Sequence, residues 1–185
     1  MREESRGSDD GQAFERVVLP HLDAAYNLAR WLVRRPQDAE DVVQEACLRT
    51  LRFLGGYQGG DARSWVLRIV RNTAYSFLEK RRPSEFAEEF DETVHAAKED
   101  PPDAEAVLLQ SAESRMLQEA LESLPIRFRE PLILRELEGL SYKEISEVLE
   151  IPIGSVMSAL ARGRARLREQ LLRTREREVA RGLRK

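Results

Sequence analysis

The sequence predicts an all-α protein in which two small helical domains are joined by an acidic, flexible linker. Apolar residues recur three and four positions apart through most of the 185 residues, and no segment alternates apolar and polar residues as a strand does. Residues 83–105 interrupt this pattern with three prolines, nine acidic residues and one basic residue. We therefore expect a disordered N-terminus at 1–12, a domain at 13–82, the linker at 83–105, a domain at 106–172 and a basic tail at 173–185.

In the first domain, a helix begins near Phe14, and Pro20 is expected in the first turn of the next helix, where its missing amide hydrogen costs nothing. The inward stripe of that second helix is predicted to be Leu22, Ala25, Tyr26, Ala29 and Leu32. Another helix follows Pro36. Its predicted buried side consists of Val43, Cys47, Leu51 and Leu54.

Residues 55–60 contain four glycines and predict a loop, because so many glycines leave no stable helix. Asp61 is placed to cap the helix that follows. That helix is expected to end in three cations before Pro83, since positive charge is favourable at a helix C-terminus.

The second domain resumes at residues 106–124, and residues 140–156 within it are typical of a helix-turn-helix. Ser141 and Glu144 have the spacing of a capping box, which predicts the start of its first helix. Pro152 ends that helix, because proline disfavours α geometry at the residue before it. Ser155 is the predicted N-cap of the second helix, whose inward residues are Val156, Leu160 and Leu167.

The second helix of this motif carries arginines at positions 162, 164, 166 and 168, which suits a DNA major groove flanked by phosphates. The chain as a whole has a net charge of −3, yet residues 162–185 hold ten basic and three acidic residues. Nucleic-acid affinity depends on such local clustering. The alternative is a basic helical hairpin that packs against protein, with its arginines on a solvated face.

Composition argues against a membrane protein and against a metalloenzyme. No apolar run approaches the ~20 residues of a membrane span, and residues 1–12 are unlike a signal peptide, so a cytoplasmic protein is expected. The single Cys47 excludes an internal disulfide and a multi-cysteine metal site. His21 and His95 are isolated, so we expect no enzyme activity, no cofactor and no metal.

Four segments in order resemble the extracytoplasmic-function class of bacterial sigma factors, which direct RNA polymerase to promoters. They are Asp38–Ala46, Ser64–Ala74, Leu124–Leu132 and the helix-turn-helix, and the resemblance covers roughly residues 14–171. It implies that core RNA polymerase and promoter DNA are the partners. It also implies control by an anti-sigma factor, with no membrane insertion of the chain itself.

One outward helix face is the candidate polymerase-binding surface. Three-and-four spacing places Asp41, Gln44, Glu45 and Leu48 on the same side of the helix after Pro36. Carboxylates beside a leucine suit a partner helix that offers arginines around an apolar pocket, although an isolated acidic face is more often merely solvated. The resemblance implies contact with the clamp of the largest polymerase subunits.

The resemblance assigns the −10 promoter element to the glycine loop and the helix that follows it. Strand opening needs a pocket that offsets the few kcal/mol of unstacking a base. Asn72 matches the family residue that hydrogen-bonds the flipped base, and Arg63, Arg68 and Arg71 are candidates for phosphate contacts. Tyr57 is the candidate stacking platform, or else a plain loop tyrosine, whereas Trp65 is expected in the core.

The −35 element is assigned, by the same resemblance, to the start of the second helix of the helix-turn-helix. The residues expected to face the groove are Ser155, Met157, Ser158, Ala159 and Arg162, with Arg164, Arg166 and Arg168 at phosphates. The family usually has basic residues where this chain has Met157 and Ala159. An absent arginine removes a guanine contact worth about 1–3 kcal/mol, so we expect an unusual −35 sequence with more shape readout.

Two readings of the linker and two other functions stay open at this point. In the family the linker threads toward the polymerase active site, where the carboxylates of residues 83–105 would mimic nucleic acid; the alternative is a soluble tether. A free-standing DNA-binding regulator would leave the Asp41 face and the Asn72 helix unexplained. A decoy that sequesters an anti-sigma factor would be expected to carry an α/β receiver domain, of which the sequence has no sign.

Overall fold

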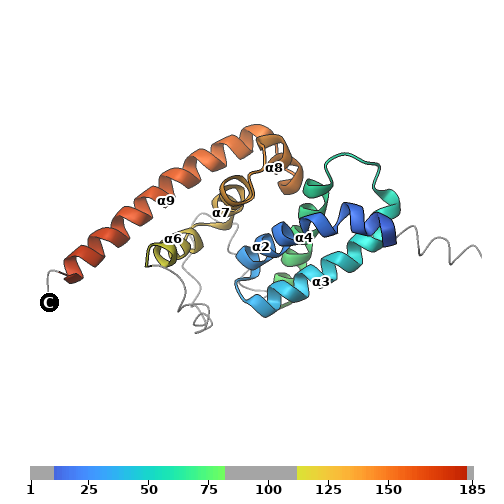
Figure 1. The fold of residues 1–185 in the computed structure, drawn as a ribbon. Coiled ribbons are helices and arrows are strands. Elements are labelled where there is room, and N and C mark those ends of the chain that lie inside the picture. Colours follow the sequence, from blue (N-terminus) through green and yellow to red (C-terminus); the bar gives the residue numbers. More distant parts are fainter. Residues whose placement is uncertain (1–10, 82–111, 183–185) are drawn as a thin grey trace, which may run out of the picture.

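The computed structural model describes residues 11–81 and 112–182, and within those ranges the chain is helical with no strand (Figure 1). The predicted linker at 83–105, the domain boundaries beside it and residues 1–10 lie outside the described residues. Within the described ranges, no helix combines the length and the apolar character needed to cross a bilayer.

The first domain is a bundle of helices around a small apolar core. Residues 11–17 are helical and are followed by η1 (Leu19–His21), α2 (Leu22–Val33), α3 (Pro36–Phe53), η2 (Leu54–Gly56) and α4 (Ala62–Arg81). Helices α2, α3 and α4 pack on one another in pairs. The predicted cap of α4 is confirmed, because the Asp61 carboxylate accepts the backbone amides of Arg63 and Ser64 at 3.1 and 3.2 Å.

The prediction for the buried side of α3 is confirmed only in part: Leu54 is buried, and Val43 and Cys47 pack against the core, but Leu51 does not. Leu51 is 40% exposed, Val43 and Cys47 are only half-buried, and the side that faces the core consists of Asp38, Ala39, Val42, Ala46 and Thr50. Apolar residues occur on two faces of this helix. The face with small residues turns inward, because it allows the close packing that a domain core requires. The larger apolar residues are therefore left outside.

The second domain contains α6 (Ala112–Glu122), α7 (Ile126–Leu132), a π-helical turn η3 (Ile133–Leu137), α8 (Tyr142–Leu149) and α9 (Ile153–Gly182). The predicted capping box is confirmed. The amide of Glu144 donates to Ser141 Oγ at 3.2 Å, and the amide of Ser141 donates to Glu144 Oε2 at 2.6 Å. Glu150 then ends α8 with a left-handed φ of 56°.

The second helix of the motif starts earlier than predicted. Helix α9 begins at Ile153, so Ser155 lies in its first turn, and the prediction that Ser155 caps it is wrong. The carbonyl of Pro152 accepts the amides of Ser155 and Val156 at 2.8 and 3.1 Å. Proline already holds the φ that a helix start needs, so it takes the position before the helix. Of the predicted inward residues, Val156 and Leu160 are buried and Leu167 is half-buried.

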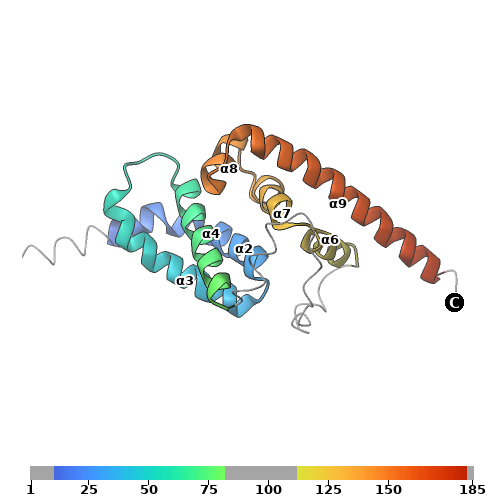
Figure 2. The same ribbon diagram turned by 180° about the vertical axis from the view of Figure 1, so that it is seen from behind.

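Helix α9 extends well beyond the motif and rests on α6 and α7 (Figures 1 and 2). It runs through the predicted boundary at residue 172, so residues 173–182 of the basic tail continue the same helix. Gly163 of α9 lies close against α7. A Cβ atom there would lie 3.0 Å from Leu132 Cδ1 and 3.2 Å from the carbonyl oxygen of Phe128.

The substitution Gly163→Val is expected to destabilise the protein by about 1–3 kcal/mol, the usual cost of forcing extra carbon into a packed interface. Urea unfolding followed by circular dichroism measures this change. Ala165→Val, on the exposed side of the same helix, is the matched control, and only the small helix-propensity cost of about 0.5 kcal/mol is expected there. Equal losses in the two variants would contradict the tight α7–α9 contact.

The two domains are in contact with each other, whereas the sequence predicted only a tether between them. Helix α8 packs on α4, and both views show the two helices beside each other (Figures 1 and 2). The turn η3 contacts α2. The buried apolar residues of the two domains form a single cluster that runs from Val18 to Leu160. This contact places the helix-turn-helix beside the glycine loop.

Candidate functional site

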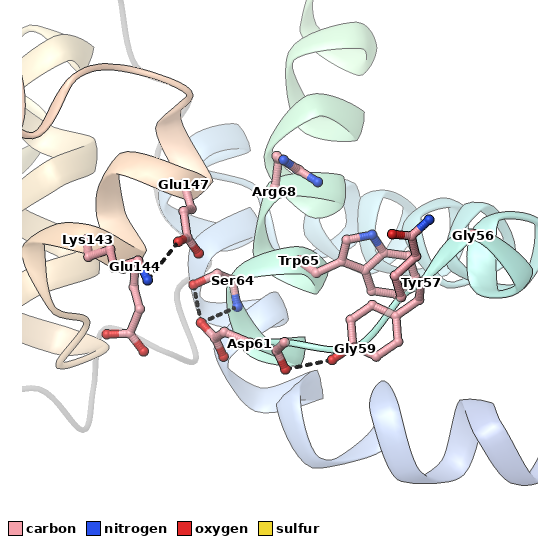
Figure 3. A pocket seen from close by; sticks show the side chains of 12 residues that line it. Gly56, Tyr57, Gly59, Asp61, Ser64, Trp65, Arg68, Lys143, Glu144 and Glu147 are labelled. Atoms are coloured by element: carbon pink, nitrogen blue, oxygen red, sulfur yellow. Dashed lines mark hydrogen bonds and ion pairs between the residues drawn. The ribbon is translucent and has the colours of Figure 1, made fainter.

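The glycine loop, the start of α4 and one side of α8 enclose a hollow of about 510 Å³ (Figure 3). We call this space the loop hollow. Its walls include Tyr57, Trp65 and Arg68 from the first domain and Lys143, Glu144 and Glu147 from the second. Gly59 and Gly60 have φ values of 89° and 102°, and this backbone conformation would be strained for residues other than glycine.

Two aromatic side chains line the loop hollow together. The rings of Tyr57 and Trp65 lie 5.0 Å apart at 42°, and the Tyr57 hydroxyl donates to the carbonyl of Gly60 at 2.8 Å. Trp65 also packs against the core, as predicted, but it is only half-buried. Its second role, as a wall of the hollow, was not predicted, because helical spacing cannot distinguish a core position from a rim position.

The three arginines predicted to hold −10 phosphates each pair with a glutamate of the second domain. Arg63 Nη2 lies 2.8 Å from Glu138 Oε2, Arg71 Nε lies 3.1 Å from Glu130 Oε1, and Arg68 Nη1 lies 3.9 Å from Glu150 Oε1. None of the three glutamates was predicted as a partner from the sequence. Arg71 and Glu130, for example, are 59 positions apart, and no local pattern joins them.

Two of these glutamates are deeply buried, with 4% of the Glu130 side chain and 5% of the Glu138 side chain exposed. Burial raises the pKa of Glu130, and the guanidinium of Arg71 opposes that shift. Glu138 also accepts a hydrogen bond from Asn27 Nδ2 at 3.3 Å. Asn72 lies apart from this network: it is exposed on α4 and is not among the residues that line the loop hollow.

The predicted polymerase face is a continuous exposed strip on α3. Asp41, Gln44, Glu45 and Leu48 are all exposed, as their spacing predicted. Glu45 accepts a hydrogen bond from Arg49 Nε at 2.9 Å, and this bond lowers the pKa of Glu45. The strip extends one turn further than predicted, because Leu51, three residues after the 52% exposed Leu48, is 40% exposed. Figures 1 and 2 show α3 on the side of the first domain away from α8.

The predicted −35 residues lie along the first turns of α9. Ser155, Met157, Ser158 and Arg162 are exposed, and Ala159 is half-buried. Two of the predicted phosphate contacts already have partners within the domain. Arg164 pairs with Glu136 at 2.7 Å, and the guanidinium of Arg166 lies 4.6 Å from the centre of the Phe128 ring. Among the described residues, no His, Cys, Asp and Glu side chains are grouped as a metal site.

Comparison with known proteins places these surfaces in a family. Sigma-70 region 2 matches residues 17–83, and Sigma-70 region 4 matches residues 114–167. The ECF RNA polymerase sigma-E factor of Haemophilus influenzae is 33% identical over 171 residues, which are 88% of this chain and 89% of that protein. The chain belongs to the ECF RNA polymerase sigma factors. The resemblance drawn from four sequence segments is thereby confirmed.

Two further relatives extend the comparison of this sigma factor. The ECF RNA polymerase sigma factor SigE of Mycolicibacterium smegmatis is 36% identical over 162 residues, and the match spans 86% of this chain but 62% of that relative. The sigma factor RpoE of Bartonella quintana, solved in complex with the anti-sigma factor NepR, has a TM-score of 0.67 at 26% identity. That match covers 85% of this chain and 96% of the other. The exposed strip of α3 and the glycine loop fall in region 2 of this sigma factor, and the helix-turn-helix falls in region 4.

Proposed function

We propose that this sigma factor binds core RNA polymerase, recognises the −10 and −35 elements of a promoter and promotes opening of the DNA. The observation that carries the proposal is the presence of both Sigma-70 regions in one chain, each with an exposed surface of suitable chemistry. The protein adds no chemistry of its own to transcription. It works where the polymerase is, so we place it in the cytoplasm.

Polymerase binding is assigned to the exposed strip of α3. Asp41 and Glu45 supply negative charge and Gln44 supplies hydrogen-bonding groups. Leu48, together with the neighbouring Leu51, supplies apolar surface. A mixture of charge and exposed large apolar side chains is what a specific protein interface needs: charges select the partner and apolar groups provide the binding energy.

Recognition of the −10 element is assigned to the loop hollow and to α4. The hollow is large enough for a nucleobase, and Tyr57 and Trp65 offer aromatic faces on which it can stack. Arg63, Arg68 and Arg71 contact the phosphates of the opened strand. Asn72, which is exposed on the same helix, supplies hydrogen bonds to the edge of a flipped base.

Recognition of the −35 element is assigned to the start of α9, where Ser155, Met157, Ser158, Ala159 and Arg162 lie. Met157 offers apolar contact to a thymine methyl group rather than a charged contact to guanine. Arg164 and Arg166 hold phosphates. An anti-sigma factor is the proposed regulator, by analogy with the Bartonella relative that was solved with one bound.

Reconstituted transcription tests this function. Core RNA polymerase freed of other sigma factors is incubated with the purified chain and with genomic DNA fragments, and the 5′ ends of transcripts are mapped. Discrete start sites that share upstream sequence elements, absent with core polymerase alone, are the expected result. If no start site depends on the chain, the proposed function is overturned.

A further inference from the structure

The outward face of the first half of α9 carries short side chains and no charge. Gly154, Ser158, Ala161 and Ala165 follow one another at intervals of three and four residues, so they lie along one side of the helix. All four are exposed, whereas the opposite side of α9 packs on α6, α7 and α8. Side chains this short let the helix axis come close to whatever surface this face meets.

Arginines line both edges of this face, starting in the third turn of the helix. The major groove is about 12 Å wide, which is close to the ~10–12 Å diameter of a helix with its side chains. A helix in the groove therefore presents its two edges to the phosphates of the two strands. At spacings of seven and four residues, one edge consists of Ser155, Arg162 and Arg166, and the other consists of Met157, Arg164 and Arg168, all of them exposed.

The first two turns of α9 lack every side chain that reads a base through two hydrogen bonds. The first residues of a recognition helix are those that contact base edges, and residues 153–160 contain no arginine, lysine, asparagine or glutamine. The exposed polar groups there are the hydroxyls of Ser155 and Ser158, which bond to several bases alike. Met157 is 53% exposed, and its apolar side chain suits the methyl group of thymine.

The outward face changes its character at Glu169. The same spacing continues through Glu169, Leu172 and Glu176, which are all exposed, so two carboxylates stand where the earlier turns have short side chains. Carboxylates are repelled by phosphates. Arg173, one turn after Glu169, pairs with it at 2.6 Å. The part of α9 suited to DNA therefore ends before Glu169, and its short-side-chain face from Gly154 to Ala165 is about 17 Å long at the helical rise of ~1.5 Å per residue.

We propose that α9 holds the −35 element mainly through phosphates on both sides of the major groove and selects its bases only weakly, with thymine as the favoured base. The proposal rests on the proposed function of region 4. Arg162 and Arg166 bind the phosphates of one strand, and Arg164 and Arg168 bind those of the other. Promoters of this sigma factor are then distinguished chiefly by their −10 element.

A promoter library with six randomised base pairs at the −35 position tests the weak selection. Core polymerase with the full chain transcribes the library from one fixed −10 element, taken from a start site mapped as above, and barcoded transcripts are counted. Each single base change is expected to alter the output less than about fivefold, the least that a good bidentate contact supplies. Selection of any base pair above that level would overturn the proposal.

Two double variants test the arginine edges, because each removes two positive charges from exposed positions of α9. Arg162→Ala with Arg168→Ala is expected to lower the output roughly 10-fold for every library member without changing their order, as lost phosphate contacts do. Arg173→Ala with Arg175→Ala, beyond Glu169, is the matched control and should stay within about twofold of the parent. Equal outputs from the two double variants would overturn the assignment of phosphates to these edges.

A gain of selectivity tests the position of Met157. Met157→Arg is expected to create a preference for guanine of more than about fivefold at one position of the library. Leu172→Arg adds the same charge beyond Glu169 and should create no preference. An unchanged profile for the Met157 variant would remove Met157 from the base edges. Failure of the proposed promoter function would appear differently, as an absence of transcripts from every library member, whereas strong guanine selection by the parent would overturn this inference alone.

Discussion

Reversing two charges on α3, with Asp41→Arg and Glu45→Arg together, is expected to weaken binding to core RNA polymerase by roughly 100-fold, because like charges across an interface cost several kcal/mol. Both side chains are exposed and neither contributes to the core, so the fold should survive. The new arginine at position 45 would face Arg49 one turn away, which costs only a few tenths of a kcal/mol within the helix. Surface plasmon resonance with immobilised core polymerase measures the affinity.

The matched control for this pair is Glu15→Arg together with Asp23→Arg, which makes the same change of charge at exposed positions elsewhere in the first domain. Its polymerase affinity is expected to stay within about twofold of the parent, because screening at physiological salt limits the reach of a charge to about 8 Å. Helix content by circular dichroism checks both proteins. Undiminished affinity in the α3 variant would refute the assignment of this strip to polymerase.

Replacing Asn72 by alanine is expected to impair promoter opening far more than polymerase binding. Hydrogen bonds to a base edge are worth about 1–3 kcal/mol, so the equilibrium constant for opening should fall about 5-fold to 150-fold. Asn72 is exposed, and its side chain is not part of the pairs that join the two domains. Permanganate footprinting of unstacked thymines measures opening on a promoter mapped in the transcription assay.

Glu79→Ala, at an exposed position two turns further along α4, is the control for the Asn72 variant. It should open the promoter as the parent does, and both variants should bind core polymerase with unchanged affinity. A footprint of the Asn72 variant as strong as that of the parent would remove Asn72 from the −10 site. A loss of polymerase binding would instead indicate that this part of α4 lies in the polymerase interface.

Local chemistry explains which features were predicted correctly. The capping box of Ser141 and Glu144 and the cap of Asp61 act on amides two or three residues away, so they can be read from spacing alone. The buried face of α3 could not be predicted from residue spacing alone. Both of its sides carry apolar residues, and the choice between them depends on the helices that pack against it. The start of α9 was misplaced because two candidate caps, Pro152 and Ser155, lie within one turn of each other.

The sequence by itself determined that the chain is helical, that it contains a helix-turn-helix, and that it resembles a sigma factor, because these depend on residues close together along the chain. The tertiary structure alone decided what the arginines of α4 contact. Arg63 and Glu138 are 75 positions apart, and their 2.8 Å contact exists because α8 and η3 pack on the first domain. An arginine on a helix surface can pair with any nearby acidic group, so only the tertiary packing determines which glutamate becomes its partner.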